Sequence, residues 1–99
     1  MILGKVIGTV WSTRKDENLV GAKFLIVRQL NIDYTPKENF IVAVDSVGAG
    51  VGEVVLCAQG SSARQTSLTK NKPIDAVIMA IVDKLDISVK EKIEEMVEP

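Results

Sequence analysis

Two apolar stretches of the chain are joined by Asp45-Ser46-Val47-Gly48-Ala49-Gly50-Val51-Gly52-Glu53, and this loop decides how the sequence is read. Three glycines alternate within it, and glycine is favoured where the backbone needs a positive φ angle or must approach another backbone closely. The flanking residues, 40–44 and 53–58, are rich in β-branched and other apolar side chains. We therefore predict two strands joined by a loop of defined shape.

Three further strands are expected over residues 2–11, 19–30 and 76–82. Gly4 and Gly8 within the first suggest a bend or bulge. Residues 12–18 form a polar hairpin connection, and 31–39 a polar loop, because Pro36 is unfavourable in a central strand. The expected architecture is mainly β: a small, closed or nearly closed barrel of five strands.

Two short helical elements complete the expectation. A single helical turn is predicted over residues 61–65, directly after the fourth strand. A C-terminal helix is predicted over residues 88–98, where Ser88 and Glu91 form a capping box. Its apolar stripe consists of Val89, Ile93, Met96 and Val97.

Several strands are apolar at consecutive positions, as in Phe24-Leu25-Ile26-Val27. A barrel has only one interior, so such strands also need cover on their outer face. The hydrophobic fraction of 46% and the mean hydropathy of +0.20 point the same way. We infer that the chain forms an oligomer.

Composition argues against several functional classes. The 99 residues suit one domain, and a net charge of −1 with 4% aromatic residues does not fit a nucleic-acid binder. The single Cys57 excludes an intramolecular disulfide, and no apolar run resembles a signal peptide or a membrane span. The chain is most simply interpreted as cytosolic.

The loop of residues 45–53, which we call the glycine loop, and its neighbours contain residues that could bind a ligand or act in catalysis. For each of them we favour a structural interpretation. A strand follows Gly48-x-Gly50-x-Gly52, whereas a nucleotide-binding loop leads into a helix, so a structural turn is preferred. Without a histidine in the chain, Cys57 is expected in the core rather than as a nucleophile. Asp45 and Glu53 could act as paired acid–base carboxylates, but bonding to loop N–H groups or to a cation is preferred.

The cluster Ser61-Ser62-Ala63-Arg64 has two interpretations. Its hydroxyls, N–H groups and guanidinium could bind a small anion. Alternatively, Arg64 could pair with Asp45 or Glu53, within the chain or across a subunit interface. We prefer the ion pair, since both acids belong to the neighbouring motif.

These residues resemble the EutN/CcmL family, the pentameric vertex proteins of bacterial microcompartment shells. The most specific match is Asp45-x-Val47-Gly48-Ala49-Gly50 followed by Gly60-Ser61-Ser62-Ala63-Arg64. Further matching segments are residues 4–10, 12–13, 19–25, 43–56 and 73–83. The resemblance covers about residues 1–86, the expected vertex domain, and leaves 87–99 as a helical tail.

The resemblance implies an OB-like barrel, a homopentamer and a place among hexameric proteins at the corners of a microcompartment shell. It implies no enzymatic activity, cofactor or metal. Gly52-Glu53 and the intact Gly-Ser-Ser-Ala-Arg are more similar to the ethanolamine- or propanediol-type members than to carboxysome members. The alternative is an OB-like module that binds single-stranded nucleic acid. The residues expected at a subunit interface or near the central pore are Asp45, Gly48, Ala49, Gly50, Gly52, Glu53, Ser61, Ser62 and Arg64.

Overall fold

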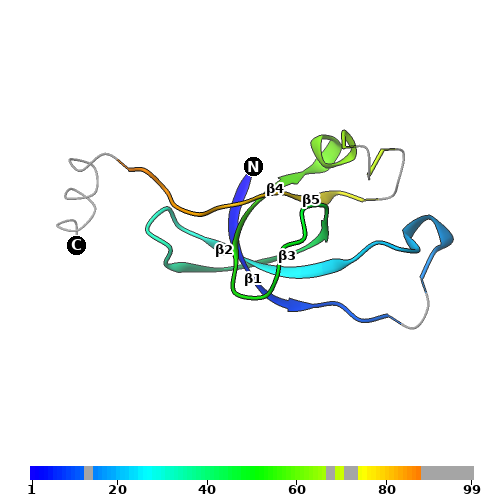
Figure 1. The fold of residues 1–99 in the computed structure, drawn as a ribbon, viewed down its shortest axis with the longest axis horizontal. Coiled ribbons are helices and arrows are strands. Elements are labelled where there is room, and N and C mark those ends of the chain that lie inside the picture. The colour runs from blue at the N-terminus through cyan, green and yellow to red at the C-terminus, as the bar shows by residue number, and fades with distance from the viewer. Residues whose placement is uncertain (13–14, 67–68, 71–73, 88–99) are drawn as a thin grey trace.

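The apolar stretches of the sequence close into a five-stranded barrel, as predicted (Figure 1). The computed structural model describes residues 1–12, 15–66, 69–70 and 74–87. Its strands are β1 (Ile2–Thr9), β2 (Phe24–Leu30), β3 (Pro36–Asp45), β4 (Val54–Gln59) and β5 (Ala76–Ile81). Two 3₁₀ turns, η1 (Glu17–Leu19) and η2 (Gly60–Arg64), lie between strands.

The strand order around the barrel is β1-β2-β3-β5-β4. All neighbouring strands are antiparallel except β3 and β5, which run parallel and pair Val44 with Val77 and Asp45 with Ile78. The hydroxyl of Ser46 donates to the carbonyl of Ile78 beside this parallel pair. The seam that closes the barrel therefore lies directly before the glycine loop.

The predicted bend in the first strand is present. The pairing of β1 with β2 shifts register between Val6 and Gly8, which leaves Ile7 as the extra residue of a β-bulge. At Gly4, a Cβ atom would lie 2.3 Å from Cγ1 of Val27 and 2.9 Å from the carbonyl oxygen of Arg28. Only glycine lets β1 approach β2 this closely.

The interior of the barrel is filled by alternate side chains of every strand. Its fully buried members are of small or moderate size, as a narrow barrel requires. They include Val6, Leu25, Val27, Ala43, Val55, Cys57 and Ile78.

Some predicted boundaries were wrong. β3 begins at Pro36 rather than at residue 40, because proline is tolerated as the first residue of a strand, where Pro36 pairs with Leu30. The second strand begins at Phe24 rather than at residue 19, since Leu19 belongs to η1 and Gly21, with φ +87°, turns the chain. The helical turn occupies Gly60–Arg64 rather than 61–65, and the helix predicted over 88–98 lies outside the described residues.

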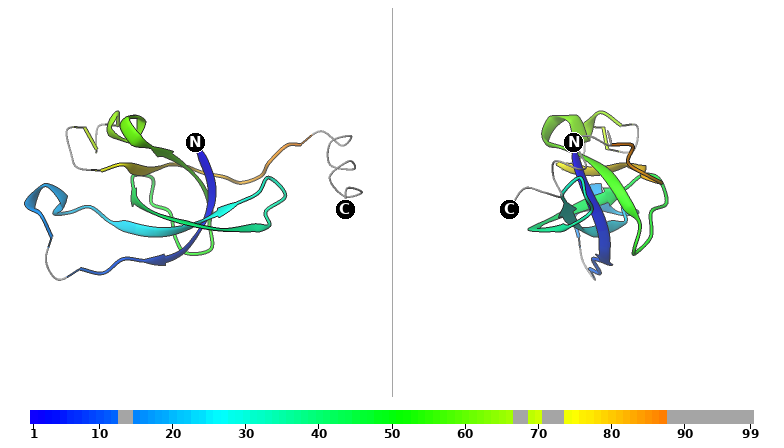
Figure 2. Two further views of the ribbon diagram at one scale, coloured as in Figure 1. Left: turned by 180° about the vertical axis from the view of Figure 1, so that it is seen from behind. Right: turned by 90° about the vertical axis from the view of Figure 1, so that its left-hand side faces the viewer.

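The connection between β1 and β2 extends beyond the barrel as a hairpin arm, formed by residues 10–12 and 15–23 of the described chain (Figures 1 and 2). The N–H of Val10 donates to the carbonyl of Phe24 at 3.0 Å and continues the β1–β2 ladder into the arm. Residues 82–87, drawn orange, leave the barrel in the opposite direction.

Candidate assembly surface

The glycine loop is held in shape by its two acidic residues. Oδ1 of Asp45 accepts hydrogen bonds from the backbone N–H groups of Val47, Gly48 and Ala49 at 3.1, 3.1 and 3.2 Å. Oε1 of Glu53 accepts from Gly50 N–H at 2.7 Å. The preferred interpretation of both carboxylates, bonding to loop N–H groups, is confirmed.

The glycines of the loop differ in backbone conformation, and so in whether another residue could replace them. Gly48 has φ +77° and Gly52 has φ +94°, conformations that other residues adopt only with strain. Gly50 has no positive φ, and a Cβ there would lie 3.5 Å from Oε1 of Glu53, an ordinary contact. Within one subunit, glycine is therefore needed at 48 and 52 but not at 50.

The second predicted motif, η2, packs as a cover on the outside of the barrel. Gly60 has φ +65°, and its N–H donates to the carbonyl of Asp75 at 2.8 Å. Ala63 is fully buried, and its carbonyl accepts a hydrogen bond from the Thr69 hydroxyl. A small residue at 63 lets the turn lie close against the strands.

Arg64 does not pair with Asp45 or Glu53 inside one subunit. The predicted ion pair is therefore wrong in its form within one chain. Nη1 of Arg64 donates to the carbonyl of Ile74 at 3.3 Å, and among the described residues no ion pair joins it to either acid. Strand β4 separates Glu53 from Gly60, which is about 20 Å of extended chain. The side chains of Ser61 and Arg64 are exposed at the end of β4 that lies away from the glycine loop.

Cys57 lies in the core, as predicted. Burial raises the pKa of its thiol to about 11, which disfavours the nucleophilic thiolate at neutral pH. No group of three or more potential metal ligands occurs among the described residues. No helix in the described part of the chain is long and apolar enough to cross a membrane.

The outer face of the sheet falls into two parts, which the sequence did not separate. In the first, which we call the covered face, Phe24, Val44 and Val77 point outward and lie beneath other segments of the same chain. The covering residues come from the hairpin arm, η2 and the segment before β5. They are Leu19, Ala22, Ala63 and Ile74.

The second part, which we call the open face, has no such cover within the described chain. Pairing aligns Gly8, Ile26 and Val42 in one row and Lys5, Arg28 and Phe40 in the next, so their side chains share one face. The open face consists of Ile7, Ile26, Phe40 and Val42, with Arg28 among them. Phe40 is 54% exposed and Val42 51%.

Arg28 is fixed on the open face by two contacts. Its Nε donates to the carbonyl of Lys37 at 2.8 Å, and its guanidinium lies 5.4 Å from the centre of the Phe40 ring. A fixed arginine beside an exposed aromatic ring is typical of the residues that contribute most to protein–protein contacts. The consecutive apolar positions of the strands were the signal for this surface, but they did not identify its members.

The chain is similar to known proteins over most of its length. A family model described as "Ethanolamine utilisation protein EutN/carboxysome" matches residues 1–83. The bacterial microcompartment shell vertex protein GrpN of Rhodospirillum rubrum is 49% identical over 86 residues, which are 87% of this chain and 97% of GrpN. The shell vertex protein PduN of Salmonella typhimurium is 47% identical, covering 86% of this chain and 98% of PduN.

A carboxysome protein and a solved structure extend the likeness. The carboxysome shell vertex protein CcmL of a Synechocystis species is 44% identical, covering 89% of this chain and 88% of CcmL. The structure described as "GrpN pentameric microcompartment shell protein from Rhodospirillum rubrum" superposes with a TM-score of 0.81 at 48% identity. The match covers 89% of this chain and all of that one.

Proposed function

The chain belongs to the EutN/CcmL family, and on this premise we propose that five copies form a ring that closes a vertex of a bacterial microcompartment shell. Like its relatives that are named shell vertex proteins, it is a structural shell protein and not an enzyme. The comparisons do not favour the alternative of a module that binds single-stranded nucleic acid.

Geometry explains why a ring of five is useful in a shell. A flat sheet of hexagonal tiles cannot close on itself, and a five-fold unit at each corner supplies the missing curvature. We propose hexameric shell proteins as the neighbours of the ring. The shell vertices named among the relatives support this setting, although those names mention no hexamer.

The observation that carries the proposal is the open face. Large apolar side chains such as Phe40 and Val42 remain more than half exposed on a sheet whose other side is the core. A contiguous apolar area of this kind marks a site of protein–protein contact. A ring gives every copy two neighbours, and each neighbour can cover part of this surface.

The glycine loop and η2 belong to the proposed interface or to the region near the central pore. Their candidate residues are Asp45, Gly48, Ala49, Gly50, Gly52, Glu53, Ser61, Ser62 and Arg64. Because the two carboxylates are used inside the loop, its outward residues are Val47 and Val51, both exposed. Arg64 donates through one nitrogen to Ile74, so its other N–H groups can reach acceptors on a neighbouring copy.

Two further assignments are proposals as well. Residues 1–86 form the vertex domain and 87–99 a separate tail, in keeping with a family match that ends at residue 83. The compartment is of the ethanolamine- or propanediol-metabolising type, on the basis of the intact Gly-Ser-Ser-Ala-Arg motif. Identities of 49% to GrpN, 47% to PduN and 44% to CcmL are close together and do not by themselves separate the compartment types.

Native mass spectrometry tests the ring directly. We expect a particle of five times 10.7 kDa that persists at micromolar concentration. Co-expression with a hexameric shell protein should give closed polyhedral shells by electron microscopy, whereas the hexamer alone should give sheets or tubes. A stable monomer, or shells that close equally well without this chain, would contradict the proposal.

A further inference from the structure

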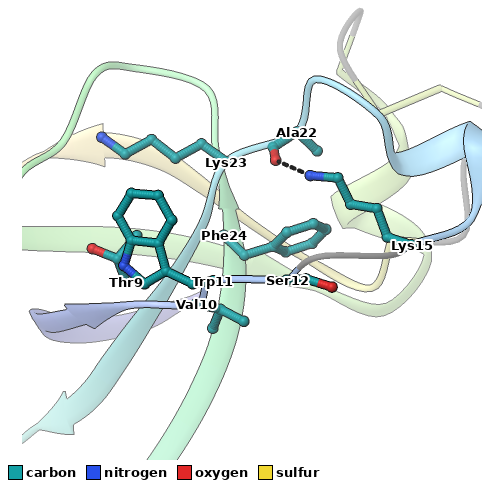
Figure 3. Close-up of a pocket in the computed structure, with 8 residues that line it drawn as sticks. All are labelled: Thr9, Val10, Trp11, Ser12, Lys15, Ala22, Lys23 and Phe24. Atoms are coloured by element: carbon teal, nitrogen blue, oxygen red, sulfur yellow. Dashed lines mark hydrogen bonds between the residues drawn. The ribbon is translucent and has the colours of Figure 1, made fainter.

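The hairpin arm carries the most exposed large apolar side chain of the described residues. Trp11 is 91% exposed, and it is the only tryptophan in the chain. It borders a groove of about 570 Å³ at the base of the arm (Figure 3). The groove is lined by Thr9, Val10, Trp11, Ser12, Lys15, Ala22, Lys23 and Phe24.

The arm is fixed to its own barrel by its other residues. Leu19 and Ala22 pack against the covered face, and Nζ of Lys15 donates to the carbonyl of Ala22 at 3.3 Å while lying 5.9 Å from the centre of the Phe24 ring. The arm therefore packs against its own barrel through Leu19 and Ala22, while the indole of Trp11 remains exposed.

The two lysines of the groove differ in what they contact. Figure 3 shows Lys15 reaching toward Ala22 and Phe24, whereas Lys23 extends in the opposite direction. Within the described residues, the side chain of Lys23 has no hydrogen bond or ion pair. The arm thus presents the exposed indole of Trp11 and the ammonium group of Lys23, which has no partner within the described residues.

The open face offers the matching chemistry. Phe40 and Val42 are exposed on β3, and Glu38, two residues before Phe40 on the same strand, is exposed and has no side-chain partner among the described residues. An apolar surface with an available carboxylate complements an indole with an available ammonium. Tryptophan also dominates binding energy where it is buried against another protein.

Ring symmetry requires that these two surfaces be different. Copies in a closed cyclic ring meet head to tail, so one patch of each copy faces an unlike patch of the next. We propose that the hairpin arm of each copy clasps the next copy, with Trp11 packed on the open face and Lys23 paired with Glu38. This inference rests on the proposed ring, and it identifies which two surfaces meet in it.

Fluorescence of the only tryptophan tests the clasp. In the intact pentamer, Trp11 emission should be blue-shifted and protected from acrylamide relative to a monomeric reference such as the Val42→Asp variant. Trp11→Ala should raise the dissociation constant of each contact by about 30-fold or more, as expected for a residue that dominates an interface. Ile32→Ala, which truncates another exposed apolar side chain outside the arm, is the matched control and should leave the ring unchanged.

A charge exchange tests the proposed pair. Lys23→Glu and Glu38→Lys should each weaken the ring, and the double variant should recover most of the loss. Lys70→Glu makes the same charge change at an exposed lysine outside the arm and should have no effect. Failure of the double variant to recover the ring would overturn the Lys23–Glu38 pairing.

The outcomes separate this inference from the proposed function. A pentamer in which Trp11 is as accessible to acrylamide as in the monomer would overturn the clasp and leave the vertex function standing. Protection that appears only when a hexameric shell protein is added would also overturn it, because the arm would then contact the shell tile. A wild-type monomer would overturn both proposals.

Discussion

Val42 and Val44 lie two residues apart on β3 and point to the same side of the sheet, yet Val42 is 51% exposed and Val44 is fully buried. The difference arises outside β3. Ala63 of η2 and Ile74 belong to the same buried cluster as Val44, whereas Val42 belongs to no buried cluster of the described chain and stays half exposed. The same strand thus contributes to the core of one subunit at Val44 and leaves Val42 available for the proposed contact between copies.

This division explains an apolar content that is high for a small barrel. The covered face is a second small core, made when other segments of the chain pack on the sheet. The open face carries apolar side chains that no described segment of the same subunit covers. Four substitutions are ordered below by their expected effect on the folding of a single subunit, and the first and last of them test the division directly.

The largest effect is expected from Val44→Asp. A carboxylate at a fully buried apolar position has no partner, which destabilises a fold by about 3–5 kcal/mol. Urea titration followed by circular dichroism should show a chain that is largely unfolded at 25 °C. A stable folded variant would mean that η2 and Ile74 are not a true cover.

A smaller loss of subunit stability is expected from Gly48→Val in the loop that follows the seam. The φ angle of +77° is strained for a β-branched residue, at a cost of about 1–3 kcal/mol. Gly50→Val is the matched control, since a Cβ at 50 meets only an ordinary contact in the subunit. An equal loss of melting temperature in both variants would contradict this distinction, and a loss of the pentamer only in Gly50→Val would place residue 50 in the ring interface.

Arg64→Ala should affect the subunit still less. It removes one long hydrogen bond to the Ile74 carbonyl, of the kind that contributes about 0.5–1.5 kcal/mol. If Arg64 also reaches a neighbouring copy, the dissociation constant of the ring should rise more than the subunit stability falls. Arg64→Lys keeps the charge without the planar donor group, and analytical ultracentrifugation compares the three proteins. A ring that dissociates equally in all three would assign Arg64 to the solvent.

The smallest effect on the subunit is expected from Val42→Asp. An exposed position tolerates a charge to within about 0.5 kcal/mol of subunit stability. The same charge buried without a partner at a ring contact should dissociate the pentamer, which light scattering would detect as a folded monomer of 10.7 kDa. An intact pentamer would show that Val42 is not part of the interface.

The sequence was informative about local structure and less so about what lies over each surface. Consecutive β-branched residues predicted five strands, and the positions of Asp45 and Glu53 predicted carboxylates that bond to loop N–H groups. Pro36 was misassigned because its rule applies inside a strand and not at its first residue. The role of Arg64 was harder to predict, because its partner in the subunit is the main-chain carbonyl of Ile74. Every residue carries such a carbonyl, so the residue type does not reveal which one accepts the bond.

The distinction between Val42 and Val44 could not be predicted from the sequence for a related reason. Alternation along a strand indicates which side chains share a face, but not which of them another segment will cover. The cover on Val44 comes from Ala63 and Ile74, which are far away in sequence. Only the closed topology brings them onto β3.

Closure of the barrel has a further consequence for how the protein behaves at high concentration. The five described strands form a closed order in which each strand has two neighbours, although β3 meets β5 only at Val44 and Asp45, so none of them is an edge strand along its whole length. Closure therefore disfavours fibre growth by addition of strands and favours contacts between copies through side chains. For a member of a family that includes shell vertex proteins, a fold that resists strand addition favours assembly through contacts of defined geometry.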